Sequence, residues 1–225
     1  MRVPASSPYF SEEDIEWVTE RFKEILRGKS FLSMGRYGEE FEKQFSRYIG
    51  TKDAVACSSG TSSLEMIFRG LNIQGKEVII PSNTFIATAL SVRNAGGIPV
   101  FVDIERKTCN LDLKLVEDFI EKDTGAILIT HMLGLTMNIK RLADICKQKG
   151  IVLIEDVAQA FGASLNGKMA GTFGDVGIYS FGMYKNLNSF FGGMLVTRHA
   201  WIDEKIRARC SGFPPQELVY FLRKV

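Results

Sequence analysis

The segment from Glu77 to Asp156 alternates short apolar runs with longer helical patterns, and this alternation limits the fold more than any other feature. The runs EVIIP, IPVFVDI, AILITH and IVLIED begin at residues 77, 98, 126 and 151. Such runs indicate strands buried on both faces of a parallel sheet. Helical patterns at 85–96, 111–122 and 138–150 separate them, which predicts right-handed βαβ units. We therefore predict an α/β fold with three α/β/α layers around a mostly parallel sheet.

The segments on either side of this alternation predict further elements. Residues 11–27 form an amphipathic helical pattern that Ser11 is placed to cap, and a glycine-rich loop near Gly35 precedes a second helical pattern. Residues 54–71 pass from the strand AVAC through the turn SSGTSS into a helix. After Asp156 we expect the strands GIYSF and GGMLVT around a loop, a helix at 201–209, and a break at Pro214 and Pro215 before QELVYFLRKV.

Composition argues against several classes of function. The 225 residues are 45% apolar, enough for a substantial core, and 28 basic residues against 26 acidic ones give a net charge of +2. Without a basic patch we expect no nucleic-acid partner. The apolar runs are too short to span a bilayer and the N-terminus lacks the order of a signal peptide, so we expect a cytoplasmic protein without membrane association. The four cysteines are widely spaced, which indicates reduced thiols and no metal site.

Two charged residues frame the segment in which chemistry is most strongly indicated. Asp156 ends the strand that begins at Ile151, at the edge where open α/β sheets bind ligands. An acid in this position also commonly caps the next helix, and alone it favours the cap. Lys185 lies 29 positions later (185 minus 156) in the aromatic and glycine-rich stretch YSFGMYKNLNSFFGG. Desolvation there would lower the pKa of the amine and make it a nucleophile, although most lysines are solvated surface residues.

Three further features fall at the ends of strands, and each has a simpler alternative. The SSGTSS turn from Ser58 to Ser63 can converge N–H groups and hydroxyls on a phosphate, but an ordinary helix cap has the same sequence. Phe85 can stack on a flat ligand, or it is a core aromatic residue at a helix start. His131 ends the strand AILITH, where it serves either as an acid or base or as a hydrogen-bonded structural residue.

The combination is more specific than its members. A phosphate-binding turn, a flat ring, an acid at a strand end and a lysine are together the set that pyridoxal phosphate requires: an anion site, a lysine that forms a Schiff base, and an acid for the pyridinium nitrogen. We therefore predict pyridoxal 5'-phosphate as the cofactor.

At these residues the sequence resembles the DegT family of pyridoxal-phosphate enzymes, best known as nucleotide-sugar aminotransferases of fold type I. The resemblance rests on SSGTSS, PSNTFIATA, FVDIERKTCNLD, THMLG, EDVAQAFGA and SFGMYKNL followed by GG, with an early glycine pattern near Gly35. It implies a division into an N-terminal helical segment at 1–30, a cofactor-binding large domain at 31–210, and the start of a C-terminal region at 211–225. Family members continue into a smaller domain, so the resemblance leads us to expect a truncated form.

The resemblance also implies a role for each matching residue. Lys185 resembles the lysine that bonds to the cofactor and later moves the proton between cofactor and substrate carbons. Asp156 resembles the partner of the pyridine nitrogen, Gln159 the ligand near the ring's hydroxyl side, and Phe85 the stacking aromatic residue. The positions that resemble the phosphate site are Gly60, Thr61 and Ser180.

The implied reaction is a transamination from glutamate to a ketosugar on a nucleoside diphosphate, in a homodimer whose active sites are completed across the interface. The chain departs from the family pattern at Gly182, where histidine is usual, and at Phe190 and Phe191, which replace a glycine and an acid. These changes predict an altered sugar pocket. The alternative is a truncated or non-catalytic protein of this fold with a binding or regulatory role, which retention of Lys185, Asp156 and Gln159 argues against.

Overall fold

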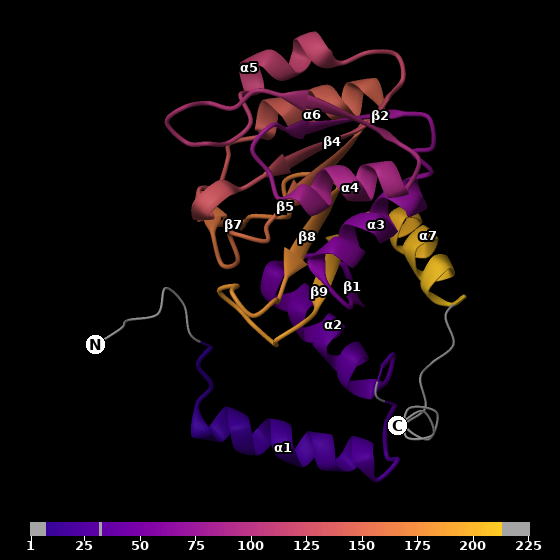
Figure 1. The fold of residues 1–225 in the computed structure, drawn as a ribbon, viewed down its shortest axis with the longest axis vertical. Coiled ribbons are helices and arrows are strands. Elements are labelled where there is room, and N and C mark those ends of the chain that lie inside the picture. Colours follow the sequence, from indigo (N-terminus) through magenta and orange to yellow (C-terminus); the bar gives the residue numbers. More distant parts are fainter. Residues whose placement is uncertain (1–7, 32, 213–225) are drawn as a thin grey trace.

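The computed structural model describes residues 8–31 and 33–212, in which seven strands form one sheet. The strand order is β1-β9-β8-β5-β4-β2-β3 (Figure 1). The bounds are β1 Asp53–Cys57, β2 Glu77–Pro81, β3 Ile98–Val102, β4 Thr124–Thr130, β5 Val152–Asp156, β8 Val176–Ser180 and β9 Gly193–Thr197. The strands from β8 to β3 pair in parallel, whereas β9 is antiparallel to both β1 and β8. The predicted mostly parallel sheet is confirmed.

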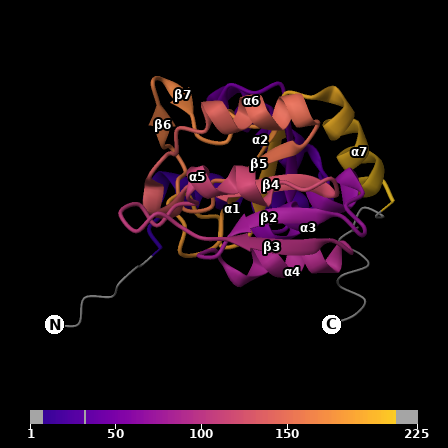
Figure 2. The same cartoon turned by 90° about the horizontal axis from the view of Figure 1, so that it is seen from above.

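Helices cover both faces of this sheet. The helices α3 (Gly60–Leu71), α4 (Ile86–Asn94) and α7 (Ala200–Cys210) bury apolar side chains with one face. The other face packs against α2 (Arg36–Ile49), α5 (Leu113–Val116) and α6 (Lys140–Lys149). Figure 2 shows α4 and α6 on opposite sides of the strands. The predicted α/β/α layers are confirmed.

The strand period decides which side chains can meet at the site. Successive residues of a strand point to opposite faces, and in β5 Leu153 joins the core under α6 while Ile154 joins the core under α3. Asp156 therefore lies on the α3 face, and Glu155 lies on the other face. By the same alternation Ile178 and Ser180 of β8 share the α3 face with Asp156.

The helix α1 (Glu12–Leu26) is capped as predicted. The Ser11 side chain accepts a hydrogen bond from Asp14 N–H, and the Asp14 side chain accepts one from Ser11 N–H. None of its residues is buried, and Trp17 and Phe22 are about half exposed. Figure 1 shows α1 lying apart from the sheet. Its helical pattern thus forms without a core of its own.

Three sequence expectations need correction or comment. The helix expected at 111–122 is only α5 followed by a 3-10 turn at Glu117–Phe119, and Val116 is its one buried residue. Helices in proteins gain most of their stability from tertiary packing. Few side chains of α5 and the 3-10 turn are buried, so little packing energy is available to extend the helix. The hairpin of β6 (Ser164–Leu165) and β7 (Lys168–Met169) was not predicted. The expected break at 214–215 and most of the region 211–225 lie outside the described residues.

Two further features of the described residues concern membrane-spanning helices and thiols. No helix in the described ranges is long and apolar enough to cross a membrane. All four cysteines are free thiols.

Candidate active site

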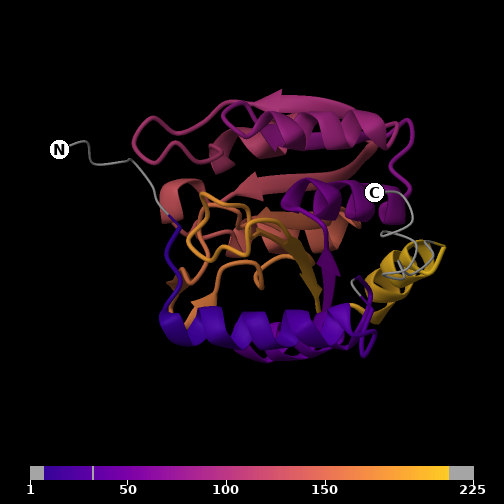
Figure 3. The same ribbon diagram turned by 60° about the horizontal axis from the view of Figure 1, so that its bottom comes forward.

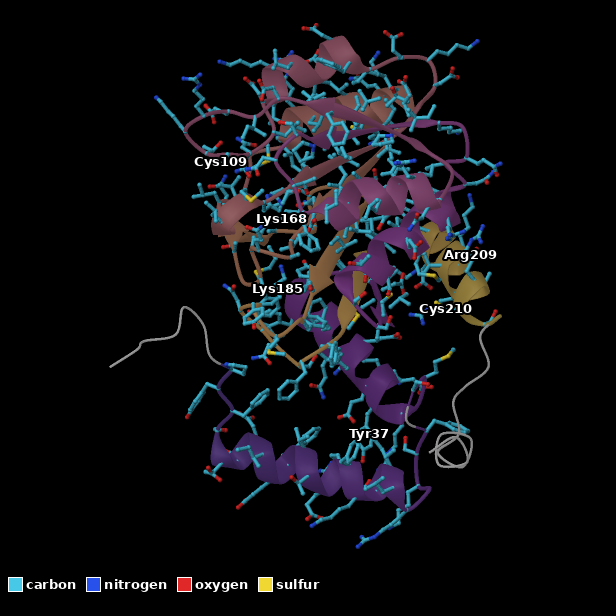
Figure 4. All side chains as sticks on the ribbon, viewed as in Figure 1. Tyr37, Cys109, Lys168, Lys185, Arg209 and Cys210 are labelled. Carbon is cyan, nitrogen blue, oxygen red and sulfur yellow. The ribbon has the colours of Figure 1, made fainter. Side chains whose placement is uncertain are left out.

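The predicted site residues gather at one edge of the sheet. The carboxyl ends of β2, β4, β5 and β8 meet there because these strands are parallel. β1 ends at the same edge, since Cys57 and Ser180 both pair with Gly193 of β9. The predicted residues all follow or end these strands: Gly60, Thr61, Phe85, Asp156, Gln159, Ser180 and Lys185. Figure 4 labels Lys185 in the loop between β8 and β9.

The SSGTSS turn forms the start of α3, as predicted, and lies against the end of β8. Ser59 caps the helix by accepting a hydrogen bond from Ser62 N–H at 3.0 Å. The N–H of Thr61 has no acceptor among the described residues, as is usual in the first turn of a helix. Ser180 is so close that a Cβ built on Gly60 would lie 2.9 Å from the Ser180 Cβ. Glycine at position 60 therefore keeps open a small cradle of N–H and hydroxyl donors, which is the chemistry that binds phosphate.

Replacing Gly60 with alanine is expected to close this cradle. The added methyl group overlaps Ser180, and overpacking of this kind costs about 1–3 kcal/mol of folding free energy. We expect weaker cofactor binding and a lower urea midpoint, measured by fluorescence titration and equilibrium unfolding. Gly38→Ala is the matched control, because a Cβ there meets nothing within 4 Å in α2 and should raise helix stability. Equal cofactor affinity of the Gly60 variant and the wild type would contradict the cradle.

Asp156 is a buried carboxylate that its fold leaves only partly satisfied. It is 5% exposed, and its Oδ1 accepts a hydrogen bond from Ala158 N–H at 2.9 Å. Its Oδ2 has no partner among the described residues. Burial raises the pKa of Asp156, while the Ala158 N–H bond and the charge of Lys185 act in the opposite direction. The next elements after Asp156 are the strands β6 and β7 and not a helix, so the helix-cap interpretation is wrong, although the residue does hold a local turn.

Lys185 lies in the loop that joins β8 to β9. Its N–H bonds to the Gly182 carbonyl at 2.9 Å, and its side chain is half-buried. The ammonium group makes no ion pair with the described residues, and its charge acts on Asp156. An amine without a fixed partner near a buried carboxylate can react with an aldehyde or ketone.

Phe85 and Gln159 occupy the loops that follow β2 and β5. Phe85 is the N-cap residue that directly precedes α4 and is 69% exposed, so the core interpretation of this ring is wrong. The hydroxyl group of Thr84, beside it, lies within hydrogen-bond distance of the Thr130 hydroxyl of β4 at 3.3 Å. Gln159 Oε1 accepts a hydrogen bond from Leu133 N–H at 3.3 Å, which links the loops after β4 and β5. An exposed aromatic ring therefore follows β2 in a loop that a hydrogen bond of Thr84 links to the end of β4.

His131 is structural, because both of its ring nitrogens are engaged in the core. The Nδ1 accepts a hydrogen bond from Met137 N–H at 3.1 Å, so the ring proton lies on Nε2, which donates to Glu155 at 2.8 Å. Glu155 is fully buried and also accepts from the N–H groups of Gly171 and Gly174 at 2.8 and 2.6 Å. Sequence reasoning missed Glu155, although an acid adjacent to Asp156 in a buried strand, with one histidine at the end of the next strand, was a usable signal.

Glu155→Ala is expected to destabilise the fold strongly. The change leaves three buried donors without their acceptor, and each buried donor left unsatisfied costs about 1–3 kcal/mol. Urea unfolding measures this loss directly. Glu204→Ala, at an exposed site on α7, should change the free energy of unfolding by less than about 0.5 kcal/mol. If the Glu155 variant also lost less than about 0.5 kcal/mol in free energy of unfolding, the hydrogen-bond network of Glu155 would not be structural.

The opposite edge of the sheet carries a separate hollow of about 430 Å3. Its lining includes Lys168, Asp175 and Arg198, which lie near the start of β8 and the end of β9. Lys168 thus lines this hollow, whose lining does not include Lys185.

The residues at the carboxyl edge fit pyridoxal phosphate. The N–H and hydroxyl donors of the cradle at Gly60 and Ser180 are groups that bind a phosphate. Among the described residues the Oδ2 of Asp156 is unbonded, and it can accept a hydrogen bond from a protonated ring nitrogen. The exposed Phe85 ring and the Lys185 amine supply the remaining two requirements. The side chains at this edge thus match the cofactor in their chemistry.

Comparison with known proteins agrees with this geometry. The model of the DegT/DnrJ/EryC1/StrS aminotransferase family matches residues 12–217. A GDP-perosamine synthase from Vibrio cholerae is 38% identical over 182 residues, which cover 80% of this chain and 50% of that protein. A pleiotropic regulatory protein from Geobacillus stearothermophilus is 37% identical over 196 residues, or 86% of this chain and 52% of that protein.

A solved structure from Streptococcus pneumoniae in its PLP form superposes with a TM-score of 0.84 and 27% identity, over 93% of this chain and 56% of that one. These likenesses indicate the fold of the pyridoxal-phosphate aminotransferases and pyridoxal phosphate as the cofactor. The chain spans about half the length of the curated relatives it matches.

Proposed function

Because the chain belongs to the DegT/DnrJ/EryC1/StrS aminotransferase family, we propose that it is a pyridoxal-phosphate-dependent aminotransferase. It takes an amino group from glutamate and transfers it to a nucleotide-linked ketosugar, for the synthesis of cell-surface or secondary-metabolite sugars. One observation carries the proposal: among the described residues, an amine without an ion pair, a buried carboxylate with one unbonded oxygen and a phosphate-type cradle meet at one sheet edge.

In this proposal each residue has one task. Lys185 bonds through Nζ to the cofactor and later carries the proton to and from the reacting carbon. Asp156 keeps the ring nitrogen protonated, and Gln159 lies on the side of the ring hydroxyl. Phe85 covers one face of the ring, while Gly60, Thr61 and Ser180 hold the phosphate. The buried position of Asp156 strengthens its attraction for a cation on the ring.

When bound, pyridoxal phosphate supplies a conjugated ring that draws electrons from the carbon that carries the amino group. Glutamate leaves its amino group in the site and departs as a keto acid, and the ketosugar then takes that group. The protein contributes by orienting the two substrates in turn and by moving one proton at Lys185. The wide exposure of Tyr184 and Phe191 beside this residue provides apolar surface for the sugar or its nucleotide.

The proposal is tested with purified protein and added pyridoxal phosphate. We expect the protein with bound cofactor to absorb at about 400–430 nm, and we expect glutamate to remove this band. One equivalent of keto acid should be released at the same time. A nucleotide-linked ketosugar should restore the band. Absence of the band and of any covalent attachment at Lys185 would rule out the proposed chemistry.

A second candidate is a non-catalytic binding or regulatory protein of this fold. The relative described as a pleiotropic regulatory protein supports it, as does the presence of Phe190 and Phe191 beside the cradle. The same experiment separates the two candidates, since the regulatory reading expects bound cofactor that glutamate does not change.

We further propose that the protein forms a homodimer and works in the cytoplasm. The half-exposed apolar side chains of α1 support a partner surface, and free thiols fit a reducing compartment. Light scattering tests the first point, and a monomer at micromolar concentration contradicts it.

A further inference from the structure

The loop that carries Lys185 is closed at its base but loosely held within. Phe181 N–H bonds to the Gly192 carbonyl at 2.9 Å, and Ser189 N–H bonds to the Phe181 carbonyl at 3.0 Å. Between these anchors Lys185 N–H bonds to the Gly182 carbonyl at 2.9 Å. Two side-chain bonds also hold the arm: Ser189 Oγ donates to the Phe191 carbonyl at 2.5 Å, and Asn188 Oδ1 accepts from Phe190 N–H at 3.5 Å. The position of the lysine therefore depends on how the returning arm, residues 189–192, is fixed.

The returning arm contains a backbone conformation that a phenylalanine rarely adopts. Phe190 has a φ of 64°, in the left-handed region where a bulky side chain is strained. One end of the arm is tied to the phosphate turn, because Gly192 N–H bonds to the Ser58 carbonyl at 3.0 Å. Strain persists in a folded protein where surrounding contacts over-determine the conformation, and such positions concentrate at functional sites.

The side chain of Phe190 contacts a residue that lies close to the N-terminal end of the described chain. The Phe190 ring stacks on Phe10, with ring centroids 5.1 Å apart and planes inclined by 25°. Phe10 directly precedes Ser11, the cap of α1. In Figures 1 and 3 the segment that leads into α1 passes beside the loop between β8 and β9. The N-terminal segment thus contacts the returning arm at Phe190, which lies five residues after Lys185 (190 minus 185).

We propose that Phe10 and Phe190 form an aromatic clamp that positions the Lys185 loop, so that both are positioning residues for the proposed reaction. The clamp holds the arm in its left-handed conformation and so limits where the Lys185 amine lies relative to Asp156 and the cradle. This inference rests on the proposed function for its effect on the cofactor, but the clamp itself is a property of the cofactor-free chain.

Three variants separate the ring contact from the backbone conformation. Phe190→Gly removes the ring and relieves the left-handed strain, so it should fold; Phe10→Ala removes only the partner ring. The double variant Phe10→Ala/Phe190→Gly tests whether the two act together. Tyr9→Ala is the control, because Tyr9 is 82% exposed beside Phe10. Phe10→Trp keeps an aromatic partner and should behave as the wild type.

The first measurement is hydrogen exchange of the amides at 182–191 in the cofactor-free chain. We expect about tenfold faster exchange in each single variant, no further increase in the double variant, and no change in the control.

The second measurement is a pH titration of the bound cofactor's absorbance, in which Phe10→Ala shifts the midpoint and Phe10→Trp restores it. Unchanged exchange in Phe10→Ala, or effects that multiply in the double variant, overturns the clamp. A wild-type chain that binds no cofactor overturns the proposed function instead, while the exchange data still test the clamp.

Discussion

Lys185→Ala is expected to abolish amino transfer, with a loss of about ten-thousandfold or more in rate. The variant loses both the nucleophile and the group that moves the proton, and proton transfer alone contributes about 10²–10⁴-fold. Cofactor held by Phe85 and the cradle should remain bound, but without a covalent bond. Single-turnover loss of the absorbance band on addition of glutamate measures the rate, and mass spectrometry after borohydride reduction locates the attachment.

Lys168→Ala is the matched control for this loss. Lys168 lines the hollow at the opposite edge of the sheet, where it lies over the Phe173 ring at 4.8 Å. We expect normal rate and normal attachment in this variant. Covalent cofactor recovered on any lysine in the Lys185 variant, together with a rate near that of the wild type, would contradict the assignment.

Asp156→Asn is expected to lower activity and raise the stability of the cofactor-free protein. Loss of the charge partner of the ring nitrogen should cost about 10²–10³-fold in rate, the range for one lost electrostatic contact in an active site. The asparagine Oδ1 can still accept the hydrogen bond from Ala158 N–H, so the turn is preserved. The gain in stability comes from removing a buried carboxylate that the fold does not fully satisfy.

The pH dependence of this gain follows from the direction of the pKa shift. Burial raises the pKa of Asp156 above its ordinary value of 3.8, so the folded chain binds this proton more tightly than the unfolded chain. Its stability therefore falls as pH rises from about 3.8 through the raised value, and stays lower above it. Below this window the wild type and the variant should not differ.

Thermal melts across this range measure the effect, with Asp144→Asn as a control at an exposed site on α6. The Asp156 variant should melt higher than the wild type at about pH 8 when free of cofactor. With cofactor bound the order should reverse, because the wild type gains its ring partner. A lower melting temperature of the cofactor-free variant at every pH would show that Asp156 is satisfied by the fold alone.

Much of the fold followed from hydrophobic pattern. The runs at Val78, Ile127 and Leu153 became parallel strands because they can only be buried on both faces, and the crossover rule fixed the helices around them. The hairpin at β6 and β7 was missed despite a local signal, since Asn166 and Gly167 both have positive φ, as an Asn-Gly hairpin turn requires.

The candidate site was predictable where chemistry is tied to strand ends. Asp156, Ser180 and the turn at Gly60 follow from position in a parallel sheet, so their meeting at one edge could be expected. The His131–Glu155 pair was missed, because the residue types signal it only when the register of the two neighbouring strands is known. The Phe10–Phe190 stack joins residues 180 positions apart (190 minus 10), and no local pattern predicts a contact at that separation.

The position of β9 between β1 and β8 affects the order in which the strands can pair during synthesis. Within the part of the chain that the structure describes, β1 pairs with β9 alone, and Cys57 meets Gly193 across 136 positions (193 minus 57). At synthesis rates of roughly 5–20 residues per second, β1 waits on the order of ten seconds for its partner to leave the ribosome. The strands β2 to β5 can pair meanwhile, so one half of the sheet forms while the first strand stays open-edged. The cradle also needs Ser180, which is made 120 positions after Gly60 (180 minus 60), so the phosphate cradle is a late product of folding.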